Sequence, residues 1–191
     1  MISDFPLGLF VLRHCRTEYN TTHRISGQSD SSIVDLSIET SALDTISIQQ
    51  QKITIISSPL ARCMQTVSYL LKQHNEIHPL IYVDSRIIER GMGCWEGKFK
   101  EDILRNHTQY CYCGQISPLI TPPHGETFDE FTTRIEDFIQ DLRIMAQNTP
   151  ILICAHNQSL KLLKYRLVGG IDLLNFWASC SFKNGKVERI Y

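Results

Sequence analysis

The chain has 191 residues, of which 42% are hydrophobic and 20% are charged, and its formal net charge at pH 7 is −1. This length predicts a single domain over residues 1–191, with enough chain to bury a core. The near-zero charge gives no general attraction to nucleic acid or to anionic lipid. The apolar run at residues 7–12 is too short to cross a bilayer and follows no basic segment, so we expect a cytoplasmic protein with no membrane partner.

The seven cysteines are odd in number and cannot all pair within one chain. Cys111 and Cys113 form the one close pair, and no histidine follows at the spacing of a zinc finger. We expect reduced thiols that mostly pack in the interior, with no metal and no cofactor.

The first half of the chain alternates between predicted strands and helices. Residues 7–12 and 52–59 read as buried strands, the second of them ended by a turn. Residues 60–73 form a predicted helix, residues 81–83 a third short strand, and residues 84–100 a glycine-rich loop beside a site. The apolar side chains of this predicted helix recur at Leu60, Met64, Val67 and Leu71.

The second half continues the same alternation. A helix is predicted over 127–147, with Thr127 as N-cap and Glu130 completing a capping box. Residues 150–155 predict a buried strand and residues 158–166 a helix. Two strands are expected within 176–191, joined by Asn184-Gly185. The pattern favours a three-layer α/β/α fold with a largely parallel central sheet, to which the hairpin adds antiparallel edge strands.

Three of the predicted strands end in residues that can carry chemistry. Arg13 and His14 follow the first strand, the segment 57–62 follows the second, and His156 follows the strand at 150–155. Open α/β sheets bind ligands at the carboxyl ends of their strands. If these strands are parallel neighbours, two histidines and two arginines converge on one crevice.

A histidine flanked by guanidinium groups is poorly placed to bind a metal cation but well placed to attack phosphorus. Neutral imidazole is a nucleophile at cellular pH, because its reference pKa is about 6.5. Arginines such as Arg13 and Arg62 can hold phosphate oxygens in bidentate fashion and stabilise the charge of phosphoryl transfer. The combination therefore points to metal-independent phosphoryl transfer by His14.

Several separated motifs resemble those of the histidine phosphatase superfamily, the group that includes phosphoglycerate mutase. Residues 13–14 resemble its Arg-His-Gly signature, and residues 58–66 match its second signature nearly residue for residue. Residues 93–97 and 125–127 are similar to two further elements of the family, in the expected order. The resemblance runs over about residues 8–167 and implies a phosphoglycerate mutase-like fold.

The resemblance also implies roles for individual residues. His14 matches the phosphorylated nucleophile, Glu89 the general acid, and His156 the second histidine, which would add stabilising charge if protonated. Arg13 and Arg62 complete the implied catalytic set. The implied substrate-binding residues are Arg13, Asn20, Ser26, Gly27, Arg62, His156 and Asn157. The expected activity is metal-independent hydrolysis of a small-molecule phosphate ester through a phosphohistidine on His14, with no nucleic-acid partner.

Some assignments have competitors. Glu96 competes with Glu89 for the role of acid, and Arg24 is either a phosphate-rim residue or a salt-bridge residue. Cys15 and Asn157 stand where the family has glycine. Cys15 could narrow the phosphate pocket.

Three other functions stay open. One is phosphoglycerate mutase-type transfer, although the segment between Glu89 and His156 is short for a mutase lid. A second is a weakly active protein that binds a phosphorylated ligand. The third is a cysteine phosphatase using Cys15, which is disfavoured because Thr21 occupies the position where that loop needs arginine.

Overall fold

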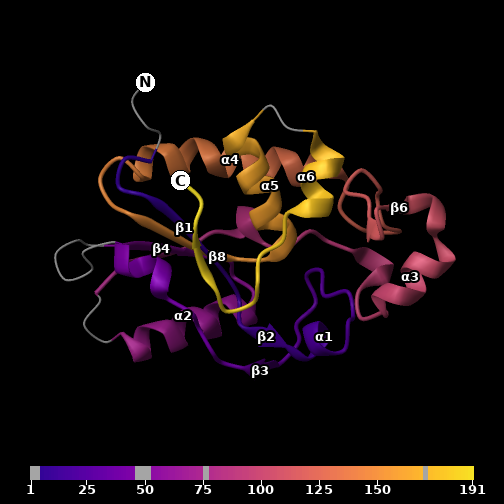
Figure 1. Ribbon diagram of the computed structural model, residues 1–191, viewed down its shortest axis with the longest axis horizontal. Coiled ribbons are helices and arrows are strands. Elements are labelled where there is room, and N and C mark those ends of the chain that lie inside the picture. Colours follow the sequence, from indigo (N-terminus) through magenta and orange to yellow (C-terminus); the bar gives the residue numbers. More distant parts are fainter. Residues whose placement is uncertain (1–4, 46–52, 75–77, 170–171) are drawn as a thin grey trace.

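The computed structural model describes residues 5–45, 53–74, 78–169 and 172–191, and its centre is a five-stranded sheet (Figure 1). The strand order is β5-β4-β8-β1-β9. The strands are β1 (Leu9–Arg13), β4 (Thr54–Ser57), β5 (Leu80–Val83), β8 (Ile151–Ala155) and β9 (Val187–Arg189). The first four are mutually parallel where they pair, and β9 runs antiparallel to β1 at one edge.

The register of the sheet brings three strand ends level. Arg13 at the end of β1 pairs with Ala155 at the end of β8, and Ser57 at the end of β4 pairs with Cys154. Since the three strands are parallel and adjacent, the residues that follow them leave the sheet at one edge. His14, Ser58 and His156 are those residues.

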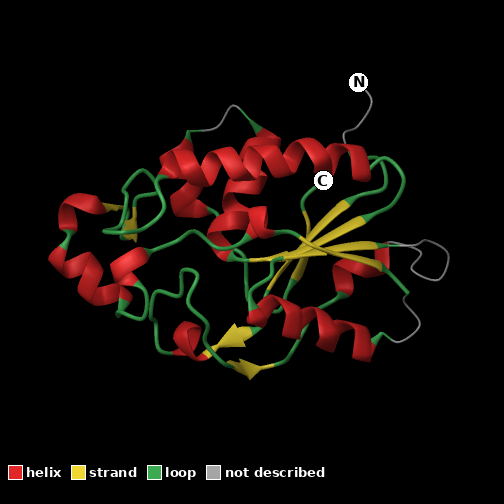
Figure 2. Cartoon of the chain, turned by 180° about the vertical axis from the view of Figure 1, so that it is seen from behind, coloured by secondary structure: helices red, strands yellow, loops and turns green. Residues whose placement is uncertain are grey.

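Helices cover both faces of the sheet, as the two opposite views show (Figures 1 and 2). One face carries α4 (Phe128–Met145), α5 (Asn157–Val168) and α6 (Leu173–Ser179), and the other carries α2 (Ala61–Gln73). Side chains alternate along β1 accordingly: Leu9 and Val11 join the core under α4 and α5, and Phe10 and Leu12 join the core under α2. The predicted three-layer α/β/α fold is confirmed.

Shorter elements surround the carboxyl edge of the sheet. The helices are α1 (Glu18–Thr21) and α3 (Lys100–Asn106), and the small strand pairs are β2 (Arg16–Thr17) with β3 (Ile33–Asp35) and β6 (Cys111–Tyr112) with β7 (Gln115–Ile116). Single 3₁₀ turns are η1 (Ser41–Thr45), η2 (Ser85–Ile87), η3 (Gly93–Trp95) and η4 (Thr108–Tyr110). None of the helices in the described ranges has the length and apolar content needed to span a bilayer.

The predicted C-terminal hairpin is wrong. Residues 173–179 form α6, whose first turn is capped by the side chain of Asp172, and only β9 is a strand. The Asn184-Gly185 turn forms hydrogen bonds with the end of β1 instead. The N–H of Gly185 donates to the carbonyl of Arg13 at 2.9 Å, and the amide of Asn184 donates to the carbonyl of His14 at 2.9 Å.

The helix predictions are confirmed in position and partly in detail. The capping box of Thr127 and Glu130 is present at the start of α4. In α2 the expected apolar face is rotated, because Met64 is 38% exposed whereas Cys63, Val67 and Leu70 are buried. The strand predicted from residue 52 begins at Thr54, and Lys52 itself lies outside the described residues.

Candidate active site

His14 has a fixed tautomer. Its Nδ1 lies 2.8 Å from the carbonyl oxygen of Cys15, and a carbonyl can only accept, so Nδ1 carries the hydrogen. Nε2 therefore holds the lone pair, and it has no hydrogen-bond partner within the described part of the chain. Burial, and after it the charges of Arg13 and Arg62, hold the pKa of His14 well below its ordinary value. The ring is therefore neutral at neutral pH, and its Nε2 has the lone pair that a nucleophile needs.

His156 is neutral for the same reasons but is fully bonded. Arg62 Nε donates to its Nδ1 at 3.3 Å, so Nε2 carries the hydrogen and donates to Ser58 Oγ at 2.8 Å. Burial, then Arg62, then His14 lower its pKa well below the ordinary value. The two rings lie side by side, with their centroids 5.2 Å apart. The charge that His156 would add if protonated is therefore absent in this state, and the arginines supply the charge of the centre.

Arg62 is bonded entirely to the protein. It is the second residue of α2 and is 1% exposed. Its two terminal nitrogens donate to the carbonyls of Ser29 and Gly27 at 2.8 and 2.7 Å, and its Nε holds His156. Arg62 thus joins the loop at 26–29 to the histidine pair and places its guanidinium beside the two rings.

Arg13 has a different environment. One terminal nitrogen donates to the carbonyl of Phe182 at 2.9 Å, but its buried Nε has no partner among the described residues. A buried donor without a partner is costly. Arg13 lines a cavity of about 190 Å³, so an anion bound there could fill this donor.

This cavity collects most of the predicted binding residues. Its volume is below the range typical for drug-sized ligands, which fits a small substrate. Predicted residues in its wall are Arg13, Asn20, Ser26, Gly27, Glu89 and Asn157. His14, His156 and Arg62 do not contribute to the wall; they are buried directly beside Arg13.

Glu89 lies in the cavity wall at the N-terminus of α5. Its carboxylate accepts hydrogen bonds from the backbone N–H groups of Arg90, Gln158 and Ser159 at 3.0 to 3.3 Å, and from the hydroxyl of Ser159 at 3.3 Å. These donors hold the carboxyl group at the start of α5, the helix whose N-cap is His156. Glu89 is 8% exposed there. The position suits a proton donor to a leaving group in the cavity.

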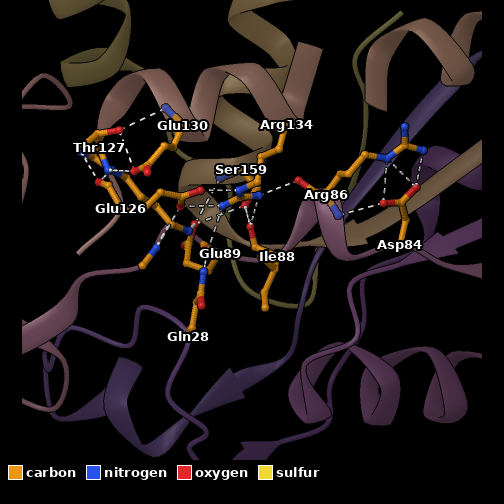
Figure 3. Close-up of polar contacts among 12 residues, drawn as sticks. Gln28, Asp84, Arg86, Ile88, Glu89, Glu126, Thr127, Glu130, Arg134 and Ser159 are labelled. Atoms are coloured by element: carbon orange, nitrogen blue, oxygen red, sulfur yellow. Dashed lines mark hydrogen bonds and ion pairs between the residues drawn. The ribbon is translucent and has the colours of Figure 1, made fainter. Parts of the chain in front are cut away.

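A second layer of contacts holds the backbone of Glu89 (Figure 3). Arg134 of α4 donates to the carbonyls of Ile88 and Glu89 at 2.8 and 3.2 Å, and its guanidinium forms a two-pronged ion pair with Glu126. Glu126 in turn accepts from the N–H of Gly91 at 3.1 Å. Glu126 is therefore a structural residue that supports the loop carrying Glu89.

The structure places Glu96, the competing candidate for the acid, and Arg24 in different positions relative to the cavity. Glu96 lies outside the cavity wall and binds the N–H groups of Gln28, Ser29 and Met92, so it joins two loops. Arg24 lines the cavity, donates to the carbonyl of Gly97 at 2.6 Å and forms no ion pair in the described ranges. The geometry favours Glu89 as the acid and Arg24 as a rim residue.

Neither departure from the family's glycines blocks the site. Cys15 points away from the cavity, with its Sγ 3.7 Å from the carbonyl of Ser37, so the expected narrowing of the pocket is wrong. Asn157 has a helical backbone as the first residue of α5, and its Oδ1 accepts from the N–H of Phe182 at 3.0 Å. Positive φ is required at neither position.

Sequence reasoning missed part of the wall. Gln158 and Lys161 of α5 and Trp177 of α6 line the cavity, together with Lys100 and Gln115. Asn157 and Lys161 are four residues apart on one helix face, a spacing visible in the sequence once His156 is placed at the N-cap. Trp177 has no such signal, because the sequence predicts strands rather than a helix within residues 176–191. In the described ranges, no group of three or more histidine, cysteine, aspartate or glutamate side chains is arranged to hold a metal ion.

Fold and site together define an α/β protein with a histidine pair and arginines at the carboxyl ends of parallel strands. The family model of the histidine phosphatase superfamily (branch 1) matches residues 9–190. The chain belongs to this superfamily.

Named relatives show what the chain is similar to. It is 31% identical over 138 residues to the fructose-2,6-bisphosphatase TIGAR of Bos taurus, covering 71% of this chain and 50% of that protein, so it spans about half of this relative's length. It is 23% identical over 177 residues to phosphoserine phosphatase 1 of Hydrogenobacter thermophilus, covering 89% and 80%. Relatives named for phosphoglycerate mutase also match.

Solved structures share the fold. A mycobacterial glucosyl-3-phosphoglycerate phosphatase in complex with VO3 superposes with a TM-score of 0.73 at 21% identity, covering 94% of this chain and 88% of that one. The relatives' names support phosphatase activity for this member of the superfamily.

Proposed function

We propose that this protein hydrolyses a phosphorylated small molecule through a phosphohistidine on His14, without a metal ion. The observation that carries the proposal is the unbonded Nε2 of a neutral His14 between two arginines. Nε2 attacks phosphorus and forms the N–P bond, the ester P–O bond breaks, and Glu89 gives its proton to the leaving oxygen. Water then attacks phosphorus, returns a proton to Glu89, and releases inorganic phosphate and His14.

The arginines and the cavity wall have separate tasks in this proposal. Arg13 and Arg62 place positive charge beside the transferring group, whose equatorial oxygens gain charge in the transition state. His156 donates through Nε2, to Ser58 in the free protein and to a phosphate oxygen in the complex. The remaining substrate contacts fall to Asn20, Ser26, Gly27 and Asn157.

The test is p-nitrophenyl phosphate turnover with and without a chelator, paired with trapping of the phosphoenzyme. We expect chelator-resistant turnover and an acid-labile, alkali-stable phosphoenzyme at His14. The His14→Ala protein should lose roughly a thousandfold or more of the activity. Cys15→Ser should retain activity, because the thiol faces Ser37 rather than the cavity. Loss in Cys15→Ser with a surviving His14→Ala would reverse the assignment of the nucleophile.

Two alternatives have distinct signatures. A mutase must shield its phosphoenzyme from water, and the short segment between Glu89 and His156 supports hydrolysis instead. Interconversion of phosphoglycerates far faster than phosphate release would overturn the proposal. Phosphate binding without any turnover would identify a binding protein.

A further inference from the structure

The C-terminal segment at residues 182–185 forms hydrogen bonds with residues of the cavity wall. The N–H of Phe182 donates to Oδ1 of Asn157 at 3.0 Å, and its carbonyl accepts from a terminal nitrogen of Arg13 at 2.9 Å. The N–H of Gly185 donates to the carbonyl of Arg13 at 2.9 Å. Both Arg13 and Asn157 line the cavity. The segment therefore supports the wall from outside, although none of its own residues lines the cavity.

The side chain of Asn184 uses both hydrogens of its amide in this region. Nδ2 donates to the carbonyl of His14 at 2.9 Å and to Oδ1 of Asn20 at 3.1 Å. A backbone carbonyl can only accept, so the contact with His14 fixes which atom of the Asn184 amide is the nitrogen. Asn184 is half-buried. Its amide thus connects the backbone of the proposed nucleophile with a side chain of the cavity wall.

The orientation of the Asn20 amide follows from the donors around its oxygen. Oδ1 accepts from Asn184, from the N–H of Thr17 at 3.2 Å and from the hydroxyl of Thr17 at 3.1 Å. Since an oxygen must face these donors, the amide nitrogen is turned away from them. Nδ2 of Asn20 has no hydrogen-bond partner among the described residues, and Asn20 lines the cavity. The amide is therefore oriented to donate to an anion.

Asn184 and Thr17 differ in how firmly they enforce this orientation. A hydroxyl can donate to an oxygen or accept from an amide nitrogen, so the Thr17 hydroxyl tolerates both orientations of the Asn20 amide. The amide nitrogen of Asn184 can only donate and tolerates one. Without Asn184, only the Thr17 N–H at 3.2 Å would oppose a flip of Asn20. A flipped Asn20 would direct Oδ1 at the phosphate, and two acceptors repel each other.

We propose that Asn184 is a positioning residue for phosphoryl transfer, which presents Nδ2 of Asn20 to the phosphate that His14 attacks. This inference rests on the proposed phosphatase function. Asn184 acts through Asn20 and does not touch the substrate, because it lies outside the cavity wall. Its bond to the carbonyl of His14 fixes the donor relative to the nucleophile before the substrate arrives, as electrostatic stabilisation requires.

The first test is a double-mutant cycle on the full chain, with p-nitrophenyl phosphate as substrate and inorganic phosphate as competitive inhibitor. Asn20→Ala should lower kcat/KM by roughly 10- to 100-fold, as expected for a hydrogen bond to a charged group. Asn184→Ala should lower it by roughly 5- to 30-fold and weaken inhibition by phosphate similarly. The double variant should lose no more than about threefold beyond Asn20→Ala, because Asn184 acts through Asn20.

The cycle overturns the proposal if the double variant loses more than that, or if Asn184→Ala keeps full kcat/KM. Asn184→Ser repeats the cycle with a polar side chain that is too short to bridge both acceptors, and it should show the same non-additivity. Lys183→Ala is the matched control, since this exposed side chain belongs to the same segment and lies outside the cavity wall. It should keep both kcat/KM and inhibition by phosphate.

The second test follows the side-chain amide of Asn20 by nuclear magnetic resonance, a signal that Asn20→Ala identifies by its loss. Saturating inorganic phosphate should shift this signal in the unmodified protein, because Nδ2 then donates to the anion. The shift should be lost or strongly reduced in Asn184→Ser. An equal shift in both proteins, or no shift in the unmodified protein, overturns the positioning role.

These outcomes separate the two proposals. If p-nitrophenyl phosphate is not hydrolysed at all, or is hydrolysed equally by His14→Ala, the proposed function fails, and the affinity for inorganic phosphate then replaces kcat/KM in the cycle. If hydrolysis depends on His14 but the losses in Asn20→Ala and Asn184→Ala multiply, the proposed function stands and Asn184 is a structural residue only.

Discussion

The histidine centre and the cavity wall beside it differ in how completely their polar groups are bonded. In the centre, each ring nitrogen of His156 and each guanidinium nitrogen of Arg62 forms a hydrogen bond with another protein group. In the wall, Arg13 Nε and Asn20 Nδ2 have no partner among the described residues.

This difference indicates a division of labour. Groups that perform chemistry need fixed orientations before the substrate arrives, because reorganisation during the reaction lowers its rate. Groups that recognise the substrate need unfilled donors, which the ligand satisfies on binding. His14 combines both features: its Nδ1 is anchored, and its Nε2 has no partner among the described residues.

The largest expected effect comes from breaking the anchored centre. Arg62→Met should lower kcat/KM by roughly 10²- to 10³-fold, because one guanidinium orients His156 and carries the charge beside His14. It should also move the acid limb of the pH–rate profile to higher pH, since Arg62 lowers the pKa of both histidines. Arg62→Lys keeps the charge and should keep the acid limb. An unmoved limb in Arg62→Met would contradict the electrostatic role.

Glu89→Gln tests the proposed general acid in the cavity wall. With an alkyl phosphate, we expect kcat to fall by roughly 10²-fold or more, and with p-nitrophenyl phosphate far less, because p-nitrophenolate leaves without a proton. Glu96→Gln is the matched control, since this carboxylate joins loops outside the wall. A leaving-group dependence that appears in Glu96→Gln and not in Glu89→Gln would exchange their roles.

Arg134→Lys tests the support behind Glu89. Lysine cannot reproduce the two-pronged contact with Glu126 or reach the same backbone carbonyls, so we expect a loss of about 2 kcal/mol in the free energy of unfolding. kcat should fall while KM changes little. Urea unfolding and steady-state kinetics measure both. Arg166→Lys, in an exposed ion pair with Glu136, should change the unfolding free energy by at most about 0.5 kcal/mol.

The pH dependence of the free energy of unfolding reports whether the two buried histidines stay unprotonated in the folded protein. Both buried histidines have lower pKa values in the folded protein than in the unfolded chain. Below about pH 6.5 the unfolded chain therefore binds more protons, and the free energy of unfolding should fall by up to about 1.4 kcal/mol per pH unit for each histidine. His14→Asn should give a shallower slope between pH 6.5 and 5.5. An identical slope would show that His14 is protonated in the folded state.

Much of this protein follows from local pattern. The apolar runs, the capping box at Thr127 and the motifs around His14 and His156 each specify their structure within a few residues, because strand burial and helix capping are short-range requirements. Their convergence was predictable, since parallel neighbouring strands end at one edge. In the sequence, only the match to the family's general acid distinguishes Glu89 from Glu96.

Tertiary structure decided the rest. The Asn184-Gly185 pair has a strong hairpin signal, yet contacts with the end of β1 and the capping of α6 by Asp172 override it. The neutral state of His156 depends on its burial beside Arg62, which lies 94 residues away in the chain. The burial of Lys161 arises only when α5, α6 and β7 enclose it, because burial is a property of the packed molecule that no single segment contains.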